Sequence, residues 1–128
     1  MTIKTLTPML RTWDLQATIK FYTTVLGFTC QSQSSIWASL KRDDIELMVS
    51  APNNHLNEHS PAFTGSLYFR TDAVDDLWNR LKNLSVVCYN IETFDYGMRE
   101  FAIYDNNGYL LQFGQPITEI TDSPGASD

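Results

Sequence analysis

Short runs of alternating apolar and polar residues recur along the chain, and two stretches between them show helical spacing instead. The first alternating run covers residues 6–11 and predicts a strand. Asp14 then precedes a helical stretch as a suitable N-cap, and Gly27 follows that stretch as a C-cap. The apolar positions of this predicted helix are Leu15, Ile19, Tyr22, Val25 and Leu26.

Three more strands are predicted after the helix, and a linker follows them. The strands cover residues 28–33, 35–40 and 45–49. Residues 51–64 contain several Pro, Asn and Ser residues without apolar periodicity, which is typical of a connecting segment.

The same order of elements restarts after the linker. A strand is predicted at residues 66–70, and Thr71 or Asp72 is suited to cap a second helix. The apolar positions of this helix are Val74, Leu77, Trp78 and Leu81. The last predicted strands are residues 86–89, 98–104 and 109–115.

The two parts also match residue by residue. The motif Thr7-x-Met9-x-Arg11 before the first helix corresponds to Ser66-x-Tyr68-x-Arg70 before the second. Near the end of each part, Glu46 and Gln112 occupy corresponding positions between apolar neighbours. We therefore predict an α+β fold of two pseudo-symmetric βαβββ halves that form a mixed sheet. The halves are residues 1–50 and 65–116 of a single domain covering 1–128, with 51–64 as linker and 117–128 as a frayed tail.

Composition excludes several classes of partner. The formal net charge is −6 with only nine Lys and Arg residues, which argues against binding to nucleic acid. No apolar run approaches the ~20 residues that cross a membrane, and the first residues lack a signal-peptide core. Cys30 and Cys88 share no CxxC spacing and are predicted to be buried thiols in a reducing cytoplasm.

Two segments carry a resemblance to a known family. Residues 8–28 run from a strand through Asp14 and Phe21-Tyr22 to Leu26-Gly27-Phe28. Residues 96–113 contain Tyr-Gly, a turn with Asn106 in place of the usual Pro, and a final strand. Together they resemble the glyoxalase / bleomycin-resistance / extradiol-dioxygenase superfamily. The resemblance implies a sheet that curls around a cavity, one helix behind each half, and a homodimer.

The same resemblance locates the positions at which the family's metal enzymes bind a divalent ion. Carried over one at a time, these positions are Thr7, Glu46, Ser66 and Gln112. Only one of the four is a carboxylate, and hydroxyls or a neutral amide are poor ligands for Ni, Fe or Zn. The set resembles the metal-free, drug-binding branch of the family, so neither a metal nor another cofactor is predicted.

Other reactive constellations are weak. His55 and His59 are four residues apart with Glu58 between them, but prolines bracket the segment and predict a solvated loop. Ser66 lacks a GxSxG context, and the six glycines form no phosphate-binding loop. No catalytic residue is assigned.

Thr7, Glu46, Ser66 and Gln112, at the positions of the family's metal ligands, are called here the former metal positions. Period-two alternation predicts which side chains share a face with them. The predicted ligand-binding residues are Thr7, Met9, Arg11, Trp37, Glu46, Met48, Ser66, Tyr68, Arg70 and Gln112. Ser39, Glu100, Ala102, Leu110 and Gly114 extend the same faces. Such a lining suits a flat, aromatic or cationic organic ligand. Glu46 is placed to pair with a ligand cation or, alternatively, with Arg11 or Arg70.

The favoured function is therefore sequestration of a small organic or antibiotic-like molecule without metal. The alternative is a lyase, isomerase or dioxygenase with a degenerate metal site that uses Glu46 and Gln112. A third possibility is a partner-binding domain whose cavity is vestigial.

Overall fold

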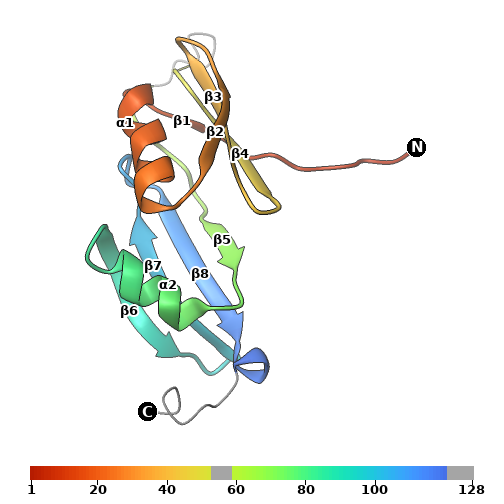
Figure 1. The fold of residues 1–128 in the computed structure, drawn as a ribbon, viewed down its shortest axis with the longest axis vertical. Coiled ribbons are helices and arrows are strands. Elements are labelled where there is room, and N and C mark those ends of the chain that lie inside the picture. Colours follow the sequence, from red (N-terminus) through yellow and green to blue (C-terminus); the bar gives the residue numbers. More distant parts are fainter. Residues whose placement is uncertain (53–58, 121–128) are drawn as a thin grey trace. The chain divides into compact units, whose positions relative to one another are not determined.

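Each half of the chain forms a four-stranded mixed sheet with one helix on one of its faces (Figure 1). The structure is a computed structural model that describes residues 1–52 and 59–120. The chain divides into two units, Met1–Ala62 and Phe63–Asp128, at a point within the predicted linker. The predicted α+β fold with two βαβββ repeats is confirmed.

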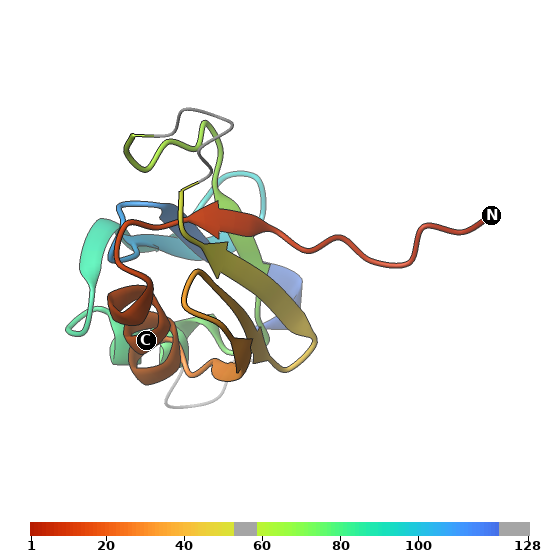
Figure 2. The same cartoon turned by 90° about the horizontal axis from the view of Figure 1, so that it is seen from above.

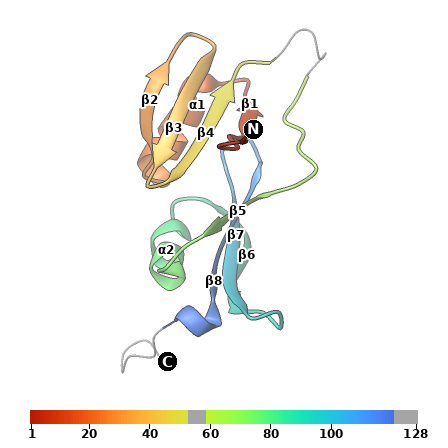
Figure 3. The same ribbon diagram turned by 90° about the vertical axis from the view of Figure 1, so that its right-hand side faces the viewer.

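The first unit has the strand order β1-β4-β3-β2, in which β1 runs parallel to β4 and the other pairs are antiparallel. In Figure 3, α1 lies behind the sheet formed by β2, β3 and β4. The elements are β1 (Met9–Arg11), α1 (Leu15–Lys20), η1 (Phe21–Val25), β2 (Thr29–Gln33), β3 (Trp37–Arg42) and β4 (Ile45–Ser50).

The first helix ends where the sequence predicts but is not a regular α-helix throughout. Asp14 accepts a hydrogen bond from the Ala17 backbone N–H, and Gly27 takes a positive φ of 73°, as expected for a C-cap. After Lys20 the helix widens into the π-helical turn η1. Two consecutive threonine hydroxyls in that turn donate back to main-chain carbonyls, which competes with the regular ladder and bends a helix.

The second unit repeats the arrangement with the strand order β5-β8-β7-β6, and β5 runs parallel to β8. Its helix packs against β7 and β8. The elements are β5 (Leu67–Arg70), α2 (Val74–Leu81), β6 (Val86–Thr93), β7 (Met98–Tyr104), β8 (Leu110–Pro116) and the 3-10 turn η3 (Ile117–Glu119). The turn η3 occupies part of the segment predicted as tail, and no helix of the described residues could span a membrane.

Stacked aromatic rings form the core between α2 and its sheet. Phe101 is fully buried, and its ring centroid lies 5.1 Å from that of Phe113 and 5.3 Å from that of Trp78. Phe113 in turn stacks on Phe69 at 5.0 Å. The rings therefore join α2 to strands β5, β7 and β8. They hold one face of this sheet, and the opposite face is polar.

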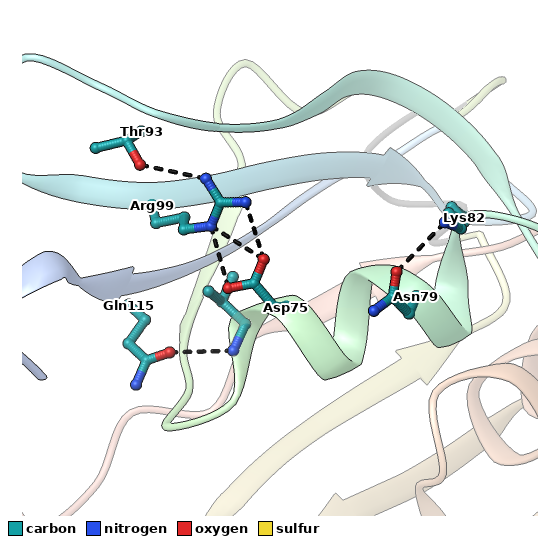
Figure 4. Close-up of polar contacts among 7 residues, drawn as sticks. Asp75, Asn79, Lys82, Thr93, Arg99 and Gln115 are labelled. Carbon is teal, nitrogen blue, oxygen red and sulfur yellow. Dashed lines mark hydrogen bonds and ion pairs between the residues drawn. The ribbon is translucent and has the colours of Figure 1, made fainter. Parts of the chain in front are cut away.

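The N-terminus of α2 is capped by a residue distant in sequence, so the predicted cap at Thr71 or Asp72 is wrong. The N-cap is Ala73, whose side chain accepts nothing. Thr71 accepts from the Ala73 backbone N–H instead, and Gln115 on β8 accepts from the Val74 backbone N–H at 3.1 Å (Figure 4). A buried glutamine from the last strand thus replaces the local cap.

A bidentate ion pair ties the same helix to the sheet. Figure 4 shows the Arg99 guanidinium donating to both carboxylate oxygens of Asp75, with Nη2 at 2.9 Å and Nε at 3.0 and 3.1 Å. Arg99 also donates to the Thr93 hydroxyl at 3.2 Å. The pair therefore connects α2 with both β6 and β7.

We expect Asp75→Asn to lower the free energy of unfolding by about 1 kcal/mol, because a partly exposed bidentate pair exceeds an ordinary surface pair only slightly. Urea denaturation measures this loss. Asp76→Asn is the matched control, since Asp76 lies in the same helical turn and is exposed. If both variants lose equal stability, the helix dipole rather than the Arg99 pair explains the effect.

Bulges in the two edge strands overturn the prediction that both cysteines are buried. Cys30 is half-buried and Cys88 is exposed, and neither is in a disulfide. Pairing between β6 and β7 slips between Val87 and Tyr89, so Cys88 is the extra residue of a bulge. The pairing of β2 with β3 slips in the same way next to Cys30.

Candidate functional site

In the first unit, the predicted residues of β1, β3 and β4 are brought to one face of the sheet. Met9 lies opposite Met48, and Trp37 lies opposite Ser50. The Thr7 hydroxyl lies 3.4 Å from a carboxylate oxygen of Glu46. These positions confirm the period-two face assignment for this sheet.

The two arginines that one alternative paired with Glu46 have other partners among the described residues. Arg11 donates to the Ser50 hydroxyl at 2.9 Å. Arg70, in the second unit, pairs with Glu119 at 3.9 Å. Glu46 itself is exposed, and the contact with Thr7 is a long one. Glu46 thus remains accessible to a ligand.

An open pocket of about 500 Å³ lies beside this face, where β2 and β3 meet the loop after the first helix. It is lined by Gly27, Thr29, Gln31, Lys41, Arg42 and Asp43. None of these residues was predicted as a site residue. Arg42 donates to the Leu26 carbonyl at 2.7 Å, so its main contact serves the end of the helix.

In the second unit, Ser66, Tyr68, Arg70 and Gln112 share the face opposite α2. Tyr68 lies opposite Gln112, and Arg70 lies opposite Gly114. The Ser66 hydroxyl donates to the Gln112 side-chain carbonyl at 2.5 Å. The two former metal positions of this unit therefore bond each other, as Thr7 and Glu46 do in the first unit.

A buried carboxyl group lies at the centre of this face. Glu100 on β7 is 2% exposed, and it accepts hydrogen bonds from the hydroxyls of Tyr68, at 2.8 Å, and Tyr89. The Gln112 amide N–H₂ donates to the Tyr89 hydroxyl at 3.0 Å. Ser66, Gln112, Tyr89, Glu100 and Tyr68 thus form one continuous network, which we call the Glu100 network.

Aromatic rings border the Glu100 network. Tyr89 packs edge-on against Phe94 at 5.8 Å between ring centroids, and Phe94 stacks on Tyr96 at 5.4 Å. Tyr96 is 65% exposed and Tyr68 is 42% exposed. The network therefore has buried acceptors and an accessible aromatic rim, a combination that is typical of small-molecule sites.

Gly114 leaves the space that the Tyr68 hydroxyl occupies. A Cβ at this position would lie 2.0 Å from Tyr68 Oη and 2.7 Å from its Cζ. Neither atom tolerates such an approach, so the absence of a side chain at Gly114 permits the contact between Tyr68 and Glu100.

Burial and the neighbouring carboxylate raise the pKa of two tyrosines in the network. The pKa of Tyr68 rises from 10.0 to about 12, first through burial and then through its hydrogen bond to Glu100. The pKa of Tyr89 is raised by the same two causes in the same order. Both phenols therefore remain donors to Glu100 over the physiological pH range.

The Tyr68 phenol is expected to stay protonated after an ordinary tyrosine ionises at about pH 10. The unfolded chain then loses this proton first, so the free energy of unfolding falls between about pH 10 and 12. Denaturation midpoints over this range measure the fall. It is expected to be smaller in Tyr68→Phe, and an equal fall in that variant would contradict the assignment.

The residues at the former metal positions do not fit a divalent metal ion. Thr7 and Ser66 supply hydroxyls, Gln112 supplies a neutral amide, and both Ser66 and Gln112 are engaged in the Glu100 network. Within residues 1–52 and 59–120, no group of three or more His, Cys, Asp or Glu side chains is arranged to hold a metal ion. His59 is exposed, whereas His55 and Glu58 lie outside the described residues.

Sequence reasoning missed Tyr89, Phe94 and Tyr96 as site residues, and it placed Glu100 only as an extension of the face. Simple alternation puts Tyr89 on the same face as Val87, which lies opposite Ile103. The bulge at Cys88 shifts Tyr89 opposite Ala102 instead, and this turns its hydroxyl towards Glu100. The Tyr96-Gly97 pair was a visible signal, because it stood within the segment that carried the family resemblance.

Comparison with known families and structures gives a consistent result. The family model described as the Glyoxalase/Bleomycin resistance protein/Dioxygenase superfamily matches residues 4–113. No curated protein sequence matches the chain.

Solved structures share the fold at low sequence identity. A glyoxalase/bleomycin resistance protein/dioxygenase from Nocardioides is 17% identical, with a TM-score of 0.73 over 96% of this chain and 90% of that one. The bleomycin resistance determinant encoded on transposon Tn5 is 24% identical, with a TM-score of 0.71 over 89% and 98%. The bleomycin-binding protein from Streptomyces verticillus, complexed with copper(II)-bleomycin, is 24% identical, with a TM-score of 0.67 over 88% and 97%.

Proposed function

Because this chain belongs to the glyoxalase/bleomycin resistance protein/dioxygenase superfamily, we propose that it binds a small organic ligand without a metal ion. The observation that carries the proposal is the Glu100 network. There, Ser66 bonds Gln112 and Gln112 bonds the Tyr89 hydroxyl, while the buried Glu100 carboxyl group accepts from Tyr89 and Tyr68. A surface of this kind orients an organic molecule through hydrogen bonds and aromatic contacts.

The ligand-binding residues of the proposal are those predicted from the sequence, with Tyr89, Tyr96 and Glu100 added. They form a polar, aromatic face on each unit, and each face is suited to contact a ligand. Sequestration needs no chemistry on the ligand.

Bleomycin is the first probe, because structural neighbours of this chain include bleomycin-binding proteins. We expect saturable binding in calorimetry with excess chelator present, and about 2.7 kcal/mol of stabilisation at 100 times the dissociation constant. Tyr68→Ala is expected to weaken binding. Asn79→Ala, on the exposed side of α2, is the control and is expected to leave it unchanged. Failure of bleomycin and of a panel of flat aromatic drugs to bind would overturn the proposal.

The alternative is an enzyme of the same superfamily with a degenerate metal site. The accessible carboxylate of Glu46 favours it, because nothing but the long contact from Thr7 engages that group among the described residues. Turnover of a hemithioacetal or a catechol that is abolished by chelation and by Glu46→Ala would support this alternative.

We also propose that the chain forms a homodimer. The residues before β1 run away from the sheet of the first unit in Figure 2, and they leave Ile3 and Leu6 94% and 92% exposed. Apolar side chains at this level of exposure are suited to contact a second copy. Sedimentation of the wild type and of a variant with Ser at both positions tests this, and a monomeric wild type would contradict it.

A further inference from the structure

The direction of every hydrogen bond in the Glu100 network follows from its chemistry. As a carboxylate, Glu100 can only accept hydrogen bonds, so Tyr68 and Tyr89 each donate their single hydroxyl hydrogen to it. The contact between Gln112 and Tyr89 must then be donated by the Gln112 amide nitrogen. This orientation turns the Gln112 carbonyl towards Ser66, whose hydroxyl must donate to it.

Because the hydroxyl hydrogens are used within the network, its accessible residues offer a ligand only hydrogen-bond acceptors. Tyr68 is 42% exposed, and its hydroxyl oxygen keeps lone pairs that can accept after it donates to Glu100. Ser66, half-buried and two residues earlier on the same face, likewise presents only lone pairs. Donation to a carboxylate also polarises the tyrosine hydroxyl, which makes it a stronger acceptor.

The carboxylate of Glu100 forms no ion pair with a basic side chain of residues 1–52 or 59–120. Arg70 is a basic residue on the same face; its ion pair is with Glu119, and its charge also acts on Tyr68. The Tyr96 side chain also interacts with Glu100, and its exposed ring, stacked on Phe94, offers an aromatic face beside the charge.

We propose that the Glu100 network recognises a protonated nitrogen group of an aromatic ligand, such as an amidinium or an ammonium, and rejects carboxylates and phosphates. This inference rests on the proposed ligand-binding function and names the chemical class of the ligand. The ligand nitrogen donates to Tyr68 Oη and Ser66 Oγ, and the charge of Glu100 and the ring of Tyr96 stabilise the cation.

Three probes of the same shape separate charge from shape: benzamidinium is cationic, benzamide is neutral, and benzoate is anionic. We expect benzamidinium to shift the amide NMR signals of β5, β7 and β8 with a dissociation constant of about millimolar, as its few atoms allow. Benzamide is expected to bind about tenfold more weakly, and benzoate is expected not to bind.

Glu100→Gln removes the charge while keeping the size of the side chain. We expect it to weaken benzamidinium binding about tenfold and benzamide binding less than about twofold. Asp72→Asn is the matched control, since it removes one exposed charge before α2 and is expected to change neither. Tyr68→Phe is a second variant that keeps Glu100 bonded to Tyr89, and it is expected to weaken benzamidinium binding about threefold.

The outcomes separate this inference from the proposed function. The inference is overturned if benzamidinium and benzoate bind equally, or if Glu100→Gln and Tyr68→Phe both leave benzamidinium affinity unchanged. A bleomycin complex would still support the proposed binding function in either case. If none of the three probes binds, the inference fails as well. Loss of affinity in Asp72→Asn equal to that in Glu100→Gln would assign the effect to overall charge and would also overturn it.

Discussion

Phe101→Ala is expected to lower the free energy of unfolding by about 3–5 kcal/mol, the largest effect of any substitution considered. Phe101 is fully buried at the centre of β7, and its ring stacks on Phe113 and packs at a tilt against Trp78. Truncation removes the contacts that join the sheet to α2 and leaves a cavity that neighbouring rigid rings fill poorly.

Chemical denaturation of the wild type and Phe101→Ala measures this loss. Phe63→Ala is the control, because Phe63 is half exposed and its ring lies 6.5 Å from that of Tyr109. The control is expected to lose less than about 1 kcal/mol. Equal losses in the two variants would show that the stacked rings do not form the core of this unit.

Gly114→Ala is expected to cost about 1–3 kcal/mol and to weaken ligand binding about tenfold or more. The added methyl group would collide with the rigid phenol of Tyr68, which must then swing away from Glu100. The buried carboxyl group thereby loses the Tyr68 hydroxyl as a donor. The effect on binding follows because Tyr68 also loses its fixed position on the face.

A second substitution separates the collision from other effects of the methyl group. In a Tyr68→Ala background the colliding ring is absent, so Gly114→Ala is expected to add less than about 0.5 kcal/mol. Gly65→Ala is the control, since a Cβ there meets only Phe63 at ordinary contact distance. A full additional loss in the Tyr68→Ala background would contradict the proposed role of Gly114.

The repeat and the composition of each sheet face were predictable because both follow from short-range rules. Period-two alternation placed Met9 with Met48 and Tyr68 with Gln112, and the pairing of β1 with β4 and of β5 with β8 confirms it. Most strand boundaries moved by only a few residues. The exception is β6, which continues to Thr93 although its apolar alternation stops earlier.

The features that sequence reasoning missed depend on contacts between distant residues. The cap of α2 comes from Gln115, about 40 residues beyond the helix start, and no local capping rule detects it. The position of Tyr89 depends on a bulge at Cys88 that alternation does not reveal. Glu100 became a buried acceptor only because strand pairing brought Tyr68 and Tyr89 beside it.

The most direct test of metal-free ligand binding is the metal content of the protein. The chain is purified without chelator or affinity metal, dialysed against Ni, Fe, Mn and Zn, and analysed for bound elements. Metal-free binding predicts fewer than about one metal ion per ten chains, because hydroxyls and an amide replace the usual ligands. Retention of about one ion per chain that is lost in Glu46→Ala would contradict it and favour the enzyme.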